Sequence, residues 1–183
     1  AYSVPTTLVF NKLDLFSEHG LEILADYKMI YEKIGYPCYE VSALKGTNIQ
    51  IIEALLKDKV TLFSGHSGVG KSSLINALLP GFEIKTGEIS ESSDKGQHTT
   101  TFAEMHALPF GGYLIDTPGI RELGVVDIEK EVLSHFFVEM RDRLNQCRFN
   151  NCRHVNEPGC AVLAAVENDE IAVSRYESYL SIY

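Results

Sequence analysis

The segment from Gly65 to Ser72 reads Gly-His-Ser-Gly-Val-Gly-Lys-Ser, which is the complete G-x-x-x-x-G-K-S spacing of a phosphate-binding loop. Its glycines let successive backbone N–H groups point at an anion, Lys71 can place its charge on the β- and γ-phosphates, and the Ser72 hydroxyl can ligate Mg²⁺. Residues 60–63 have the pattern of a buried strand and residues 73–79 that of a helix. The segment therefore predicts an α/β fold with a nucleotide at this loop, contacted by Gly65, His66, Ser67, Gly68, Val69, Gly70, Lys71, Ser72 and Ser73.

A second motif, Asn11-Lys12-Leu13-Asp14, follows an apolar run that is typical of a strand. The Asp14 carboxylate can accept hydrogen bonds from guanine N1–H and N2–H₂. Adenine has no donor at these positions and would leave a buried carboxylate unpaired, which is costly. Asn11 can bond the edge of the base, and the stem of Lys12 can cover the face of the ring. The motif predicts GTP as the ligand and speaks against an ATP-using P-loop kinase or ATPase.

The order of the motifs indicates a circular permutation. In an ordinary GTPase the phosphate loop comes first and the guanine motif last, whereas here Asn11 to Asp14 precedes Gly65 to Ser72. Between them, Ser42-Ala43 resembles the short loop in which a backbone N–H, here that of Ala43, meets guanine O6. The serine-alanine pair alone would carry no weight, but in this order it supports the guanine motif.

A third element concerns Mg²⁺ and the γ-phosphate. A predicted strand at residues 113–116 ends in Asp116, which can hold Mg²⁺ through water, and Gly119 can turn its N–H toward the γ-phosphate. The polar stretch 81–97 leads into His98 and a threonine run. Such a loop suits a switch in which one threonine of the run caps Mg²⁺ when GTP is bound. The alternative for the run is simply the start of a β-strand, because threonine favours strands.

A cysteine and histidine cluster lies near the C-terminus, formed by Cys147, Cys152, His154 and Cys160. Three thiolates and one imidazole make a closed tetrahedral set, the structural type of zinc site. The alternatives are disulfides or buried free thiols. No secretory or membrane segment is evident, and a nucleotide-binding protein works in a reducing cytoplasm, which disfavours disulfides. The short spacings also indicate metal ligands.

These motifs together resemble the RsgA/YjeQ family of circularly permuted bacterial GTPases. The resemblance rests on NKLD, SALKG, GHSGVGKSS, GQHTTT, DTPGI and the metal cluster in this order, and it covers the chain from about Val4 onward. It implies GTP hydrolysis stimulated by the small ribosomal subunit, a role in late maturation of that subunit, and Thr100 as the threonine that caps Mg²⁺.

The chain departs from the family pattern at its start. Family members begin with an oligonucleotide-binding barrel, and the permuted domain should contain a further strand and helix before the NKxD strand. Only residues 1–6 precede it, so we expect a fragment, or an N-terminal part carried elsewhere. The net charge of −9 indicates weak RNA binding by this chain alone, since phosphate contacts need Lys and Arg. Contacts with the small subunit and its rRNA are expected mainly through the barrel, with Arg148 and Arg153 as candidates here.

Catalysis should be slow without a partner. Many GTPases place a glutamine after the DxxG glycine to orient the attacking water, and here that position is Ile120. His98 is the candidate for this role, because an imidazole can accept or donate near neutral pH. Its alternative role is contact with the partner or the switch backbone.

We assign catalytic functions to Lys71, His98, Thr100 and Gly119. The alternative function is a GTP-regulated ribosome-binding module with little hydrolysis.

The predicted organisation has two parts. Residues 1–126 form a circularly permuted P-loop GTPase domain of α/β class, and residues 127–183 form a zinc-binding module of helices and loops. Within them we expect helices at 17–34, after an N-cap at Asn48, at 128–144, and at 161–183 with a break near Asn168. We expect a monomer in the cytoplasm without membrane contact. The tyrosines at helical spacing, Tyr176, Tyr179 and Tyr183, are expected to pack internally.

Overall fold

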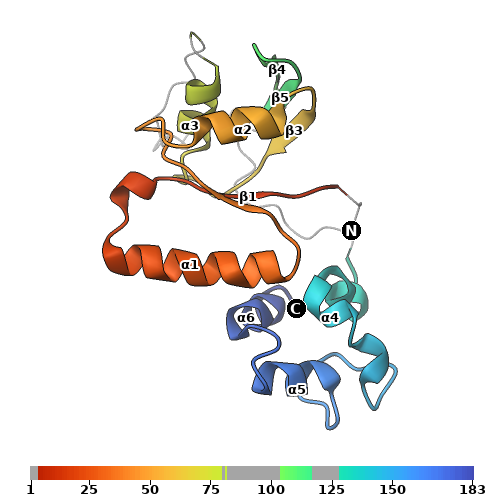
Figure 1. Cartoon of the computed structure of the whole chain (residues 1–183). Coiled ribbons are helices and arrows are strands. Elements are labelled where there is room, and N and C mark those ends of the chain that lie inside the picture. Colours follow the sequence, from red (N-terminus) through yellow and green to blue (C-terminus); the bar gives the residue numbers. More distant parts are fainter. Residues whose placement is uncertain (1–3, 80, 82–103, 117–127) are drawn as a thin grey trace, which may run out of the picture. The chain divides into compact units, whose positions relative to one another are not determined.

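The computed structural model describes residues 4–79, 81, 104–116 and 128–183. The chain divides into two compact units (Figure 1). Among the described residues, one unit contains 7–25 together with 38–116. The other contains 4–6, 26–37 and 128–183. The helix α1 (Glu18–Lys33) contributes its first half to one unit and its second half to the other.

Short parallel strands position the loops of the first unit. Strand β1 (Leu8–Phe10) pairs in parallel with β2 (Cys38–Glu40), and β3 (Val60–Phe63) pairs in parallel with β5 (Tyr113–Asp116). Strand β4 (Glu104–Ala107) adds to β5 in the antiparallel sense, which gives the order β3-β5-β4. The predicted strands are confirmed, and each predicted binding loop begins at the carboxyl end of a parallel strand, where open α/β sheets place their ligands.

The core of this unit lies between two helices and the sheet. Helix α2 (Ile49–Leu56) contributes Ile52 and Leu56, and helix α3 (Lys71–Leu78) contributes Ile75 and Leu78. These side chains pack around Leu114, which is fully buried on β5. Burying a side chain of this size contributes about 1.5–3 kcal/mol. The core therefore fixes the phosphate loop, since α3 begins at Lys71 itself.

The start of α2 differs from the expected capping. Asn48 occupies the N-cap position but has φ 60°, and its side chain makes no capping bond. Its amide instead donates to the Glu40 carbonyl oxygen at 2.9 Å. The left-handed conformation, which asparagine tolerates, turns the side chain away from the helix and toward the end of β2. Asn48 therefore lies at the predicted N-cap position, but the prediction that its side chain caps the helix is wrong.

The second unit consists mainly of short helices. It contains the 3-10 segment η2 (Lys130–Phe136), α4 (Val138–Arg141), η3 (Leu144–Gln146), α5 (Ala161–Glu167) and α6 (Val173–Ile182). The expected division of 161–183 near Asn168 is confirmed. The helical link expected at 128–144 is present but interrupted, because Phe137 has extended backbone angles between η2 and α4. This turn places the Phe137 ring edge-on to Tyr179, with ring centroids 5.4 Å apart.

A buried ion pair supports this second core. The Arg175 guanidinium of α6 donates to the Glu139 carboxylate of α4 at 2.7 Å, and the two side chains are 15% and 4% exposed. The guanidinium also lies over the rings of Tyr31, from α1, and Phe137. Burial opposes the charge on Arg175, but the hydrogen bond and charge of Glu139 outweigh it, so the pKa of Arg175 is raised. In the described part of the chain, no helix has both the length and the apolar character needed to cross a membrane.

Candidate nucleotide site and metal centre

The phosphate loop closes around the side chain of Lys71. The Lys71 ammonium donates to the carbonyl oxygens of Gly65 at 2.5 Å and His66 at 2.9 Å. Gly70, with φ 91°, ends the loop, and its carbonyl accepts from Leu74 N–H at 2.9 Å to begin α3. A Cβ at Gly70 would collide with the Asn11 amide. Glycine is therefore required there both for its conformation and for this close approach.

The Asn11 side chain joins three segments that lie far apart in the sequence. Its Nδ2 donates to the carbonyl oxygens of Val69 at 3.2 Å and Gly70 at 3.3 Å, in the phosphate loop. Its Oδ1 accepts from the backbone N–H of Ala43 at 3.1 Å and from that of Lys12 at 2.8 Å. The structure thus uses the Asn11 amide to connect the guanine motif with the two other predicted nucleotide loops.

Two groups that the sequence assigns to the base have partners within the protein. The Asn11 amide, predicted to bond the edge of the base, bonds the phosphate loop and the Ala43 loop. The Ala43 N–H, expected at guanine O6, is donated to Asn11. Asp14 does lie beside the Ser42 loop, because the Ser42 hydroxyl donates to its carboxylate. Ser42 Oγ in turn accepts from Lys45 N–H at 3.1 Å, which fixes the turn of this loop. Assignment of these residues to the base stays a prediction.

Three of the assigned residues lie outside the described part of the chain. These are His98, Thr100 and Gly119. Asp116 is described for its backbone, which pairs with Phe63 of β3 and Glu104 of β4. The pairing with Phe63 places Asp116 at the carboxyl end of β5, on the strand next to the one that leads into the phosphate loop. This is the position that its expected role near Mg²⁺ requires.

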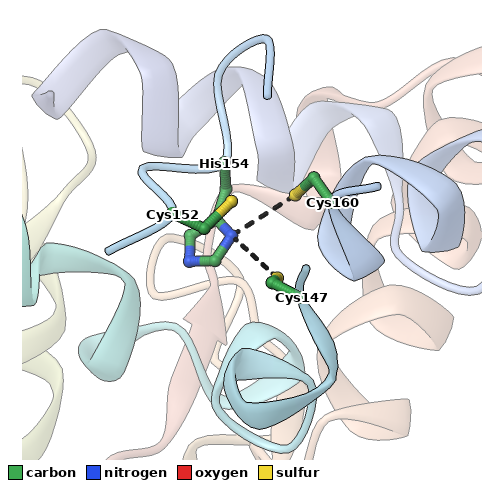
Figure 2. Close-up of side chains that lie close together, drawn as sticks. All are labelled: Cys147, Cys152, His154 and Cys160. Atoms are coloured by element: carbon green, nitrogen blue, oxygen red, sulfur yellow. Dashed lines mark hydrogen bonds between the residues drawn. The ribbon is translucent and has the colours of Figure 1, made fainter. Parts of the chain in front are cut away.

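The four predicted metal ligands converge in the second unit (Figure 2). One ligand atom from each of Cys147, Cys152, His154 and Cys160 lies within 4.8 Å of every other. His154 Nδ1 is 3.6 Å from Cys147 Sγ and 3.4 Å from Cys160 Sγ. A tetrahedral zinc ion with Zn–S of about 2.3 Å and Zn–N of about 2.0 Å requires sulfur–nitrogen separations of about 3.5 Å. The donor set and its spacing therefore fit one zinc ion.

The protonation of these ligands depends on their burial. Burial raises the pKa of Cys152 to about 12, with a further contribution from the neighbouring thiols, and it also raises the pKa of Cys160. Burial lowers the pKa of His154, which keeps its imidazole neutral and able to ligate a metal. A divalent cation among the three thiols would reverse the penalty on the thiolates, since a coordinated thiol is deprotonated. The three thiols and the neutral imidazole therefore make a site suited to a divalent cation.

Glu157 organises the loop that carries His154. Its carboxylate accepts from the backbone N–H groups of Arg153 at 2.8 Å, Val155 at 2.9 Å and Asn156 at 3.1 Å. Burial alone would raise the pKa of Glu157, but these bonds outweigh it and lower the pKa to about 2. They fold the loop around the carboxylate, and His154 adopts a left-handed conformation with φ 58°. Nothing in the sequence marked this carboxylate.

Two tyrosines of α6 hold the same loop from the other side. The Tyr176 hydroxyl donates to the His154 carbonyl oxygen at 2.8 Å, and that of Tyr179 donates to the Arg153 carbonyl oxygen at 2.6 Å. Tyr179 is also buried in the core, and burial raises the pKa of its phenol to about 12. The expected internal packing is thus correct, and the helical spacing of the tyrosines was its signal. Their hydrogen bonds to the ligand loop were not foreseen.

Comparison with known proteins shows the family to which the chain belongs. The family model described as RsgA GTPase matches residues 1–126. The small ribosomal subunit biogenesis GTPase RsgA of Bacteroides fragilis is 53% identical over 182 residues, which is 100% of this chain and 59% of that protein. The protein of the same name from Flavobacterium psychrophilum is also 53% identical, over 100% of this chain and 56% of its own length.

Solved structures support the same relationship. The crystal structure of YjeQ from Thermotoga maritima matches with a TM-score of 0.83 and 42% identity, covering 98% of this chain and 59% of that one. YloQ, described as a circularly permuted GTPase, matches with a TM-score of 0.74 and 34% identity, covering 96% of this chain and 54% of that one. The chain thus spans less than two thirds of these relatives and has the permuted fold that the motif order predicted. It belongs to the RsgA GTPase family.

Proposed function

We propose that the chain binds GTP with Mg²⁺ and hydrolyses it to GDP and phosphate, as part of a factor for late maturation of the small ribosomal subunit. The observation that carries this proposal is the Asn11 amide, which bonds the phosphate loop and the Ala43 loop at once. This bonding supports the assignment of phosphate and guanine recognition to one unit of the chain. The relatives' name, small ribosomal subunit biogenesis GTPase, supports the biological role.

The residues divide the work as follows. Lys71 neutralises the β- and γ-phosphates, and the backbone N–H groups of the phosphate loop at the start of α3 orient them. Asp14, held by the Ser42 hydroxyl, reads the guanine N1–H and N2–H₂ donors. Ser72, Asp116 and Thr100 are proposed to hold Mg²⁺ directly or through water. When bound, the ion neutralises charge that develops on the phosphate oxygens. Gly119 is proposed as the sensor of the γ-phosphate.

The proposal includes a boundary between two domains. Residues 1–126 would form the GTPase domain and residues 127–183 the zinc-binding module. The end of the family match at residue 126 supports this boundary. The zinc, held by the four ligands named above, would be structural, because all four positions are filled by protein. A monomeric state, a cytoplasmic location and rRNA contacts of the small subunit stay predictions.

Guanine selection through Asp14 is tested by Asp14→Asn. The variant should lose affinity for GTP by at least about a hundredfold and gain affinity for xanthosine triphosphate, since a site built for a donor rejects an analogue that lacks it. Titration with fluorescent analogues of both nucleotides measures this. Asp26→Asn, on α1, is the matched control and should behave like the unchanged protein. An Asp14→Asn protein with unaltered preference for GTP would refute the assignment.

Hydrolysis is tested with His98→Ala. Turnover of GTP is measured with and without purified small ribosomal subunits, in a version of the protein that carries the expected N-terminal barrel. His19→Ala serves as the control because His19 is an exposed residue of α1. We expect His98→Ala to keep GTP affinity and lose stimulated turnover by about tenfold or more, which is about 1.4 kcal/mol in the barrier. Unchanged stimulated turnover would remove His98 from the mechanism. Absence of stimulated turnover in the unchanged protein would favour the GTP-regulated binding module.

A further inference from the structure

A groove of about 470 Å³ lies between helices α1 and α6, within one compact unit of the chain. On the α1 side it is lined by Tyr27 and Tyr31, which are four positions apart and therefore lie on one face of that helix. The side chains from α6 also have the spacing of one helical face, and they are Ser174, Glu177, Ser178, Ser181 and Ile182. The volume is within the range of about 300–1,000 Å³ that is usual for ligand sites.

The groove presents an aromatic face and a carboxylate that have no partner in the described part of the chain. Tyr27 keeps 43% of its surface exposed. Among the described residues, no cation and no second ring lies against the Tyr27 ring, and none forms an ion pair or hydrogen bond with the Glu177 carboxylate. An aromatic face attracts a planar guanidinium, and a carboxylate accepts two parallel hydrogen bonds from the same group. The two side chains therefore suit an arginine.

The chain itself already holds one guanidinium between a tyrosine ring and a carboxylate. Arg175 lies over the ring of Tyr31, 5.2 Å from its centroid, and donates to the Glu139 carboxylate at 2.7 Å. The charge of Arg175 is balanced by Glu139, so it adds little positive charge to the groove. Tyr27 and Glu177 offer the same two kinds of group to a guanidinium from outside the chain.

The remaining polar groups of the groove are suited to accept hydrogen bonds from a cation. The Ser178 hydroxyl donates to the Ser174 carbonyl oxygen at 2.8 Å, which leaves the hydroxyl oxygen able to accept. The described lining contains one carboxylate and no lysine, arginine or histidine. Contacts with RNA phosphates or with an anionic lipid surface need such cations. The charge of the groove therefore favours a basic protein segment over RNA or a membrane.

From these observations we propose that the groove binds an extended, arginine-rich segment of another protein. One guanidinium of the segment stacks on Tyr27 and pairs with Glu177, and the serine hydroxyls accept its remaining hydrogen bonds. Ile182, which is 47% exposed, offers an apolar contact for the arginine stem. No lining residue belongs to the nucleotide loops or to the metal ligands, so the proposal goes beyond the proposed function and does not rest on it.

The surface is tested with a short fluorescein-labelled peptide of alternating arginine and glycine at about 50 mM salt. Fluorescence anisotropy measures its affinity for the zinc-loaded chain. Glu177→Gln and Tyr27→Leu should each weaken binding by about two- to fivefold, and the double variant by about tenfold. Tyr27→Phe keeps the ring and should bind like the unchanged protein. Glu32→Gln removes the same charge from an exposed position of α1 outside the groove, and as the matched control it should also bind like the unchanged protein.

A second measurement locates the peptide on the unchanged protein. Amide chemical-shift changes on addition of the unlabelled peptide should centre on residues 27–31 and 174–182. Shifts elsewhere, no binding, or equal affinities of Glu177→Gln and Glu32→Gln would overturn the proposal. Free arginine that binds as tightly as the peptide would indicate a small-cation site, and groove shifts on concentrating the chain without peptide would indicate a second copy; either result would also overturn it. GTP affinity and zinc content should not change in these variants, so failure of the nucleotide assignment remains separately visible.

Discussion

The two sites of this chain are assembled in opposite ways. The four metal ligands come from the short segment Cys147–Cys160, and their side chains converge because local turns bring them together. The nucleotide loops come from three distant segments, and the Asn11 amide bonds across separations of 32 and 59 residues. A locally assembled site can be recognised from its ligand spacing alone. A site assembled from distant loops depends on contacts between side chain and backbone that no spacing reports.

The largest expected effect separates the two sites. Cys160→Ser removes a ligand that is also the N-cap of α5, where its sulfur accepts from Leu163 N–H at 3.4 Å. Structural zinc contributes on the order of 10 kcal/mol to the folding of small modules, so the module should lose zinc and its ordered loops. Zinc analysis and circular dichroism measure this. GTP affinity should change less than about twofold if the sites are independent.

The matched control for this variant is Cys38→Ala, at the buried cysteine of β2. It should keep a full zinc content. A Cys160→Ser protein that still binds one zinc per chain would show that the cluster is not the metal site. A large loss of GTP affinity on zinc removal would show that the two sites are coupled after all.

The next largest effect concerns the core beneath the metal loops. Glu139→Ala leaves the Arg175 guanidinium buried without its partner and should destabilise the second unit by about 3–5 kcal/mol. The change in the free energy of unfolding is measured by urea titration, with the circular dichroism of the helices as the signal. Glu170→Ala breaks the more exposed pair with Arg143 and should cost only about 0–1 kcal/mol. Equal losses in the two variants would contradict the role given to the buried pair.

A smaller effect tests the connection between the nucleotide loops. Asn11→Ala removes the acceptor of the Ala43 N–H and the donor to the phosphate loop. The Ala43 N–H and the Val69 carbonyl oxygen then lack a partner, which should cost about 1–3 kcal/mol of stability in the nucleotide loops. GTP affinity should fall by about 5- to 100-fold, measured by nucleotide titration, while the zinc content stays full. Asn48→Gly removes an amide bond of the same unit outside the nucleotide loops and should leave GTP affinity unchanged.

The smallest effect depends on pH. The pKa of Glu157 is about 2 in the folded chain against an ordinary value of 4.5, so its ionised form is favoured by folding. Its contribution to stability is therefore complete above about pH 4.5 and is lost as the pH falls toward 2. Glu157→Gln should cost about 1–2 kcal/mol near pH 7.

Both Glu157→Gln and the unchanged protein lose zinc in acid. The difference between their free energies of unfolding therefore isolates the contribution of the ionised Glu157 carboxylate. Urea unfolding at a series of pH values should show their difference shrinking below about pH 4.5. Glu167→Gln, on the exposed side of α5, is the control and should show no such difference. A difference that stays constant with pH would contradict the assigned role of the carboxylate.

The sequence by itself determined the fold class, the motif order and the metal ligands. The phosphate-loop spacing and the strands around it are local properties of the chain, and the four metal ligands lie within 14 residues of one another. Short-range patterns of this kind constrain the backbone directly, because the chemistry of phosphate or zinc needs those residue types at those intervals. The break near Asn168 between α5 and α6 followed in the same way from local composition.

Only the tertiary structure decided how these parts are held. The Asn11 amide bonds the phosphate loop, 59 positions further along the chain, and the Asn48 amide bonds the end of β2 instead of capping its own helix, because folding brings these acceptors within reach. Phe137 interrupted a predicted helix to pack its ring on Tyr179, 42 positions further along the chain. The Glu139–Arg175 pair and the Glu157 carboxylate had no sequence signal, since the burial and hydrogen bonds that define them arise only when the chain has folded.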